Sequence, residues 1–213
     1  MGQGAIIWAV AVASATGVGE AGAQTRDPPP VPTFAKTVVL APVSGKVLIH
    51  VPGPQHRFVR LASATVVPVG TVVDTTAGRV RLTSADPGPK PAELQTGQFF
   101  RGRFQVRQKR TAGGLVNLVL RDNLSQSACG SGPARAAAVN RRVLGLLRGT
   151  AKGRFRTTGR FAAATVRGTD WGVRDRCDGT LTVVRRGVVV VRDFRLHKTV
   201  VVRAGQTYLA TAG

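Results

Sequence analysis

The side chains that could support catalysis are few and scattered along this chain. Its 213 residues include only 10 Asp and Glu and three His. Acid–base or nucleophilic catalysis needs paired groups of this kind, and Gly130-Ser131-Gly132 resembles a nucleophile turn only superficially. No His spacing matches a zinc motif. The sequence therefore predicts no catalytic residue, no metal site and no cofactor, and an extracellular hydrolase is the alternative.

The densest acidic group surrounds a tryptophan. Asp170, Asp175 and Asp178 lie close to Trp171 in the sequence, and each has an arginine within three residues. A hard cation such as calcium would need more oxygen ligands than these three side chains offer, so salt bridges are favoured over a metal site. Trp171 itself is expected to fill the core or to cover a sheet edge, and a carbohydrate-stacking platform is the alternative.

Arginines at alternate positions are the strongest binding candidates in a chain of net charge +21. In a strand over residues 97–108, alternate side chains share a face, so Arg101, Arg103, Gln105 and Arg107 should project together while Phe100, Gly102, Phe104 and Val106 face the other side. Such ladders suit anionic cell-wall polymers or an anionic membrane surface, whereas a specific nucleic-acid partner is not expected. A solvated basic surface with no ligand remains the alternative. The candidates are Arg79, Arg81, Arg101, Arg103, Arg107, Arg154 and Arg156.

The two cysteines, Cys129 and Cys177, are predicted to form a disulfide. Two cysteines in an exported chain most often pair. A redox role for two free thiols is the alternative, but it lacks the close Cys-x-x-Cys spacing that lowers a thiol pKa.

The N-terminus indicates export. Residues 5–19 are apolar but too short to span a bilayer, and the small residues Ala21-Gly22-Ala23 follow them. We expect a signal peptide over 1–23, although no Lys or Arg precedes the apolar run, so a membrane anchor or a buried helix stays open. Residues 24–33 form a Pro-rich linker. The mature protein is expected to be secreted, associated with the cell envelope and without a transmembrane helix.

Short β-branched runs between glycine and proline turns predict an all-β fold, as a β-meander or sandwich or as stacked β-units. One short helix is expected near 134–147. The strands are expected at 45–51, 57–61, 70–74, 78–84, 97–108, 115–121, 154–158, 162–168, 171–175, 180–184, 187–194 and 199–203.

Two sequence fragments suggest an internal repeat within a domain over 34–210. Residues 75–79 resemble 157–160, and Arg-Gly-x-x-x-Val-Arg occurs at 101–107 and at 186–192, giving offsets of 82 and 85 residues. Two β-units, 34–121 and 153–210, would explain both matches. Chance matches between abundant Arg, Gly and Val are the alternative.

The C-terminal third carries a family resemblance. Ala164-Thr-Val-Arg-Gly-Thr169, Trp171, the strands around Gly187 and Val201-Val-Arg-Ala-Gly205 occur in an order that resembles the FecR-type domain of bacterial cell-envelope proteins. An earlier element, 69–75 with 78–82, is similar to the Gly-x-x-Val-x-Thr element of that family. The segment Asp175-Arg-Cys-Asp-Gly-Thr-Leu-Thr182 also resembles secreted proteins of high-GC Gram-positive bacteria. The resemblance implies an extracytoplasmic, non-catalytic binding or structural domain, without the signal relay of FecR itself.

Overall fold

The computed structural model describes residues 29–54, 57–87, 93–121, 124, 126–129 and 141–213 of the chain. The expected signal peptide at 1–23 and residues 24–28 of the linker lie outside these residues. None of the helices in the described ranges is long and apolar enough to cross a membrane.

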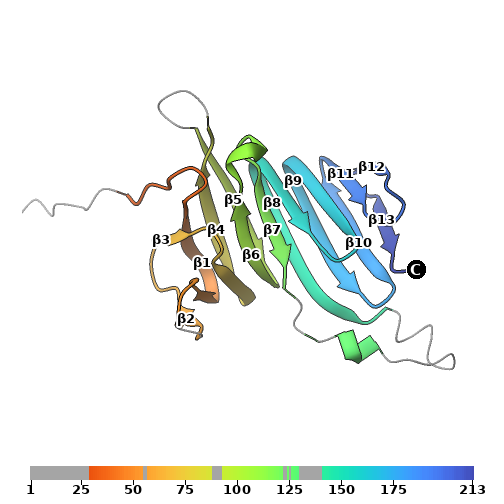
Figure 1. The fold of residues 1–213 in the computed structure, drawn as a ribbon, viewed down its shortest axis with the longest axis horizontal. Coiled ribbons are helices and arrows are strands. Elements are labelled where there is room, and N and C mark those ends of the chain that lie inside the picture. The colour runs from red at the N-terminus through yellow and green to blue at the C-terminus, as the bar shows by residue number, and fades with distance from the viewer. Residues whose placement is uncertain (1–28, 55–56, 88–92, 122–123, 125, 130–140) are drawn as a thin grey trace, which may run out of the picture.

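The fold is all-β, as predicted, and the thirteen strands of the described residues belong to one hydrogen-bonded network (Figure 1). Two single-turn 3-10 helices, η1 (Arg110–Ala112) and η2 (Gln126–Cys129), precede and follow the seventh strand. The strands are β1 (Thr37–His50), β2 (Val59–Arg60), β3 (Thr65–Pro68), β4 (Val72–Ala85), β5 (Leu94–Phe100), β6 (Arg103–Gln108), β7 (Val116–Leu120), β8 (Val143–Thr158), β9 (Ala162–Arg176), β10 (Gly179–Arg186), β11 (Val188–Asp193), β12 (Thr199–Arg203) and β13 (Thr207–Thr211).

The centre of the molecule is a closed ring of five strands. β4 pairs with β5 and β6, β5 pairs with β8, β8 pairs in parallel with β7, and β7 pairs with β6. Because β5 joins β4 to β8 on one side of the ring and β6 with β7 joins them on the other, the outer faces of β5 and of β6–β7 point in opposite directions. β1 extends the ring from the far edge of β4, and β9 extends it from the far edge of β8.

Aromatic side chains fill the ring. Phe99 of β5 is fully buried, and its ring centroid lies 5.7 Å from that of Phe104, 5.5 Å from that of Phe155 and 6.1 Å from that of Trp171. The Trp171 indole N–H donates to the Thr157 hydroxyl at 3.2 Å, so its polar group has a partner inside the core. Trp171 is therefore a core residue, as expected, and is not available as a carbohydrate platform.

The predicted strand over 97–108 is wrong at its centre, because the chain crosses from β5 to β6 there. Arg101 has φ +67°, in the left-handed region. At Gly102 the backbone passes so close to β8 that a Cβ would lie 1.5 Å from the Leu146 carbonyl oxygen. A close approach between distant segments leaves no mark in hydrophobic periodicity, so the sequence pattern runs through the crossing without a break.

The predicted helix near 134–147 is wrong over residues 143–147, which begin β8. Residues 134–140 of that prediction lie outside the described residues. Here the chain pairs with β9, and Gly145 and Gly149, which are poor helix formers, lie within β8. Elsewhere pairs of predicted strands merge: 70–74 with 78–84 into β4, and 162–168 with 171–175 into β9.

The topology repeats along the chain. β4 pairs through its C-terminal half with β5 and through its N-terminal half with β6, and β9 pairs in the same way with β10 and β11. β6 then pairs with β7 as β11 pairs with β12. The repeated Arg-Gly pairs, Arg101-Gly102 and Arg186-Gly187, both stand at the crossing between these halves. Residues 75–79 and 157–160 do not occupy equivalent places, and the division into units at 34–121 and 153–210 stays a prediction.

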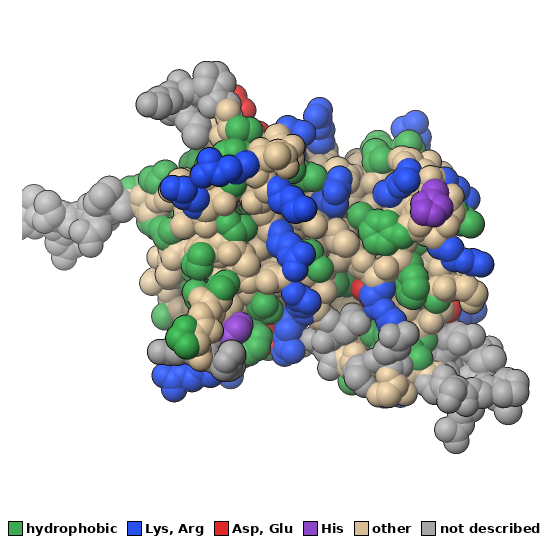
Figure 2. Space-filling view, in the orientation of Figure 1, with side chains coloured by type: hydrophobic (Ala, Val, Ile, Leu, Met, Phe, Trp, Pro, Cys, Tyr) green, Lys and Arg blue, Asp and Glu red, His purple; other side chains and the backbone are tan. Residues whose placement is uncertain are grey.

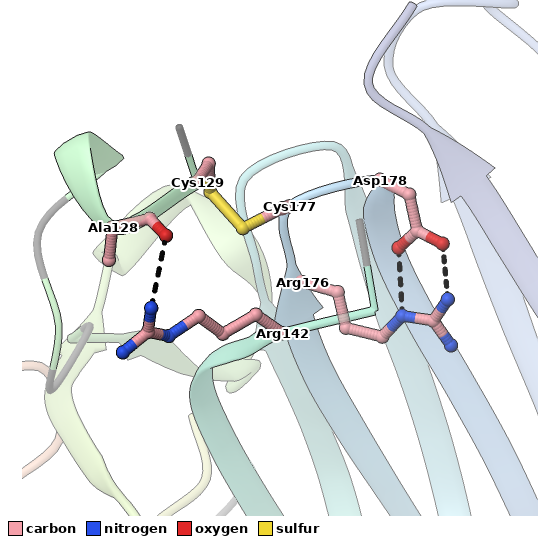
Figure 3. Close-up of a disulfide and its surroundings, with 6 residues drawn as sticks. All are labelled: Ala128, Cys129, Arg142, Arg176, Cys177 and Asp178. Carbon is pink, nitrogen blue, oxygen red and sulfur yellow. Dashed lines mark hydrogen bonds and ion pairs between the residues drawn. A yellow bond between two sulfur atoms is a disulfide. The ribbon is translucent and has the colours of Figure 1, made fainter. Parts of the chain in front are cut away.

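A disulfide joins Cys129 and Cys177, as predicted, with 5.4 Å between the Cα atoms (Figure 3). It connects η2 to the turn between β9 and β10. Beside it, the Arg142 guanidinium donates to the Ala128 carbonyl at 3.3 Å, and Arg176 forms an ion pair with Asp178. The bridge thus fixes the start of the long connection from β7 to β8 against the second half of the fold.

Candidate anion-binding faces

The seven arginines singled out from the sequence do not form one surface. Arg79 and Arg81 lie on β4 beside β5, whereas Arg103, Arg107 and Arg156 lie on the opposite side of the ring. We call the outer surface of β6, β7 and the C-terminal half of β8 the β6–β7 face, and the outer surface of β5 with its neighbours β4 and β8 the β5 face. Figure 2 shows the first of these, with a column of Lys and Arg side chains over its central strands.

Cross-strand pairing places polar side chains of the β6–β7 face in one row. Arg107 pairs with Asn117, and Asn117 pairs with Arg156, so the two arginines flank the amide in one row. The Thr158 hydroxyl donates to the Asn117 side-chain oxygen at 2.7 Å, and the Arg156 Nε donates to the Thr165 hydroxyl at 3.1 Å. These contacts hold the row in place with neutral partners and leave the guanidinium charge of Arg156 without a carboxylate in the described part of the chain.

Two guanidinium groups converge on one amide oxygen of this face. Arg107 donates to Gln105 Oε1 from Nε at 3.2 Å and from Nη2 at 3.0 Å, and Arg121 donates to the same oxygen from Nη2. Neither arginine has a carboxylate partner among the described residues. Arg121 was missed from the sequence, although it follows Asn117 and Val119 at alternate positions and so could have been assigned to this face.

Arg103 differs from its neighbours because its charge is neutralised. It donates to Asp74 Oδ2 from Nε at 3.1 Å and from Nη2 at 2.7 Å, and it lies 5.1 Å from the ring centroid of Phe58. Burial raises the pKa of the Asp74 carboxyl, but hydrogen bonds from Thr76 and from Arg103 outweigh it and hold the pKa below its ordinary value. Arg103 therefore acts as an internal ion-pair partner rather than as a free cation.

Arg101 and Arg154 are also placed differently from the ladder prediction. Arg101 is exposed, but it lies at the crossing between strands and shares no strand face with Arg103 and Arg107. Arg154 donates from Nη1 to the Gly113 carbonyl oxygen, which draws it toward the turn between η1 and β7. Phe100 was expected beside Phe104, but it lies on the outer surface because the crossing reverses the alternation.

On the β5 face, two arginines stack on Phe100. The Arg79 guanidinium carbon lies 4.0 Å from the Phe100 ring centroid, and that of Arg148 lies 5.2 Å from it. All three residues belong to one cross-strand row, since Phe100 pairs with Arg79 on β4 and with Arg148 on β8. Stacking on an aromatic ring orders a guanidinium while leaving its charge intact.

The three acidic residues near Trp171 lie apart and have different surroundings. Asp175 is buried and accepts hydrogen bonds from the Arg160 backbone N–H and the Thr180 hydroxyl, whereas Asp170 lies on the outer side of the same strand. Asp178 pairs with Arg176. Within the described ranges, no three His, Cys, Asp or Glu side chains are placed to hold a metal ion.

A comparison with known proteins found no match among family models, curated proteins or solved structures. The case for function therefore depends on the residues of this chain. The described part of the chain contains the ion pairs Arg103–Asp74 and Arg176–Asp178, and because the sequence has 31 Lys and Arg against 10 Asp and Glu, most of its positive charge has no acidic partner.

Proposed function

We propose that this protein is a secreted, FecR-like, non-catalytic domain of the bacterial cell envelope that binds anionic cell-wall polymers through its β6–β7 face. The observation that carries the proposal is the convergence of Arg107 and Arg121 on the oxygen of Gln105. Two like charges held side by side without a carboxylate repel each other, and an external anion would relieve that repulsion. Their remaining N–H groups can donate to phosphate or carboxylate oxygens.

The spacing of the arginines supports a repeating ligand rather than a single ion. Arg107 and Arg156 are two strands apart, which corresponds to about 10 Å at the usual strand separation. Arg121 extends the charge beyond the end of β7. A flexible polymer with several negative groups could contact all three side chains, whereas a small anion would reach only one pair.

An extracytoplasmic location is supported by three features: the apolar N-terminal segment, the disulfide and the FecR resemblance in the C-terminal third. A disulfide is compatible with an oxidising compartment. Subcellular fractionation of the tagged protein, with intact-mass analysis of the mature form, tests this part. If the protein is exported, its measured mass should match a chain that begins at Gln24. A cytosolic protein whose mass includes Trp8 would contradict export.

The hydrolase alternative would need an acid and a base facing a common pocket. Asp170 and Asp175 point to opposite sides of β9, since Asp170 pairs with Thr150 on the outer surface while Asp175 is buried. His50 ends β1 and His197 lies between β11 and β12, at opposite ends of the fold. This separation favours binding over hydrolysis.

Retention on immobilised wall polymer over a salt gradient tests the binding proposal. The variant Arg107→Gln/Arg121→Gln/Arg156→Gln should elute at clearly lower salt than the native protein. If each arginine releases about 0.7 counterion, as for a flexible polyanion, the slope of log affinity against log salt falls by about 2.

A matched control removes the same charge elsewhere. The variant Arg174→Gln/Arg185→Gln/Arg186→Gln changes exposed residues of β9 and β10, which lie beyond the N-terminal half of β8 and outside the β6–β7 face. It should retain near-native binding. Equal weakening by both variants would mean that net charge alone causes binding, and it would refute the face-specific proposal. Binding to anionic vesicles but not to wall polymer would mean that the ligand is a membrane surface rather than a polymer.

A further inference from the structure

A second, separate feature lies on the opposite side of the ring, where the β5 face is hollowed between β4 and β8. The hollow has a volume of about 220 Å³. This is smaller than the roughly 300–1,000 Å³ of pockets that enclose drug-sized ligands, and it suits a small polar group. Its lining residues are Arg81, Thr96, Gly97, Gln98, Thr150, Ala151 and Lys152.

Strand register explains the shape of the hollow. Gln98 of β5 pairs with Arg81 on one side and Thr150 on the other, and Thr96 pairs with Lys152 in the next row. The short side chains of Thr96 and Thr150 therefore leave open space at the centre of the hollow. Arg81 and Lys152 are exposed long cations on the two strands that flank β5 and form opposite walls about 10 Å apart at their backbones.

The lining offers hydrogen-bond donors and positive charge but no carboxylate. The Arg79 Nη1 donates to Gln98 Oε1 at 3.4 Å, so the amide oxygen is occupied and the amide N–H groups are left to donate. Thr96 and Thr150 add hydroxyl groups. Asp170 is the nearest acid along the row, one strand beyond Thr150, and it faces Arg186 across the next strand pair.

The row beyond Gln98 adds two ordered cations, because Arg79 and Arg148 stack on Phe100. Four basic side chains, Arg79, Arg81, Arg148 and Lys152, thus surround a floor of hydroxyl and amide donors. Tetrahedral oxyanions with several acceptor oxygens match such a set better than a planar carboxylate does, because their oxygens point toward the floor and both walls at once.

We propose that this hollow is a discrete site for one phosphate group, either as inorganic phosphate or as a phosphoryl group on a larger molecule. The site goes beyond polymer binding on the β6–β7 face, since it lies on the other side of the ring and shares no side chain with it. One phosphate per protein is expected, and polymer retention is not required for it.

The test is a titration with inorganic phosphate at fixed ionic strength, followed by the backbone amide NMR signals of Gly97, Gln98 and Thr150. Saturable shifts confined to this neighbourhood, with one phosphate bound per protein by calorimetry, are expected. The variant Arg81→Gln/Lys152→Gln should weaken phosphate binding at least 10-fold while its melting temperature stays native. Arg192→Gln/Arg203→Gln, which removes equal charge from exposed positions of β11 and β12 outside both proposed sites, should bind phosphate normally.

A competition arm distinguishes the two sources of the phosphate group. A short phosphodiester oligomer that displaces inorganic phosphate from the same amides would identify the group as part of a polymer, and failure to compete would identify the free ion. Linear, non-saturating shifts, or equal weakening by the two double variants, would overturn the site. Neither result depends on the wall-polymer experiment, so the two proposals fail separately.

Discussion

The disulfide makes a quantitative prediction about stability, because its loop is defined by the chain. Cys129 and Cys177 are 48 residues apart in sequence. The loop-entropy relation gives about 4 kcal/mol of stabilisation for a loop of this length, through constraint of the unfolded chain. The Cα–Cα distance of 5.4 Å lies within the usual range for unstrained bridges, so little of this is lost to distortion.

The perturbation is the double substitution Cys129→Ser/Cys177→Ser. A loss of about 4 kcal/mol corresponds to a fall in melting temperature of roughly 8–16 °C for a protein of this size. Urea unfolding should show a lower midpoint and a steeper slope, because the unfolded chain without the bridge is less compact and exposes more surface. Thermal unfolding by circular dichroism and urea unfolding by tryptophan fluorescence measure the two quantities.

The native protein in excess reductant is the control, and it should match the double variant within about 2 °C. A fall in melting temperature of less than about 2 °C in both samples would refute the reasoning. It would mean that the connection from β7 to β8 is already constrained in the unfolded chain, or that closing this loop with the disulfide does not stabilise the folded ring.

Three further predictions test the core and its polar contacts. The chain has a single tyrosine, so tyrosinate absorbance reports Tyr208 alone. Burial and the hydrogen bond to Asp193 raise the pKa of Tyr208 to about 12. Asp193→Asn should therefore move the absorbance midpoint toward 10. Since the folded pKa lies above the unfolded one, this proton should contribute stability below pH 10 that falls between pH 10 and 12, as urea midpoints across that range would show. Gly102→Ala should cost more than about 3 kcal/mol in urea unfolding, because its Cβ would overlap the Leu146 carbonyl, whereas Gly172→Ala meets its nearest atom at 3.4 Å and should cost little.

Local pattern predicted which segments are strands, but not where they bend. Runs of Val and Thr between glycines identified most of β4, β9, β11 and β12. The first half of β1 was missed because Pro42 and Gly45 interrupt it, and β13 because its five residues include only two that are β-branched. The crossing at Gly102 depends on contact with β8, which local periodicity does not contain.

The binding candidates show the same limit. Alternation within one strand correctly placed Arg79 with Arg81, since the two share the outer side of β4. It could not show which side of the ring each ladder faces, because that depends on cross-strand register. Arg148 was missed because it follows a segment interpreted as helical, and its place beside Phe100 emerges only once β8 is paired with β5.

The repeated topology has a consequence for the order in which the chain folds. β8 pairs with both β5 and β7, so the first strand of the second half completes the ring of the first half. A nascent chain that has reached residue 121 therefore holds two unpaired strand edges and an uncovered Phe99. The N-terminal half must wait for residues 143–158 before its core is sealed, which makes the slow, long-range step of folding also the step that hides its aggregation-prone edges.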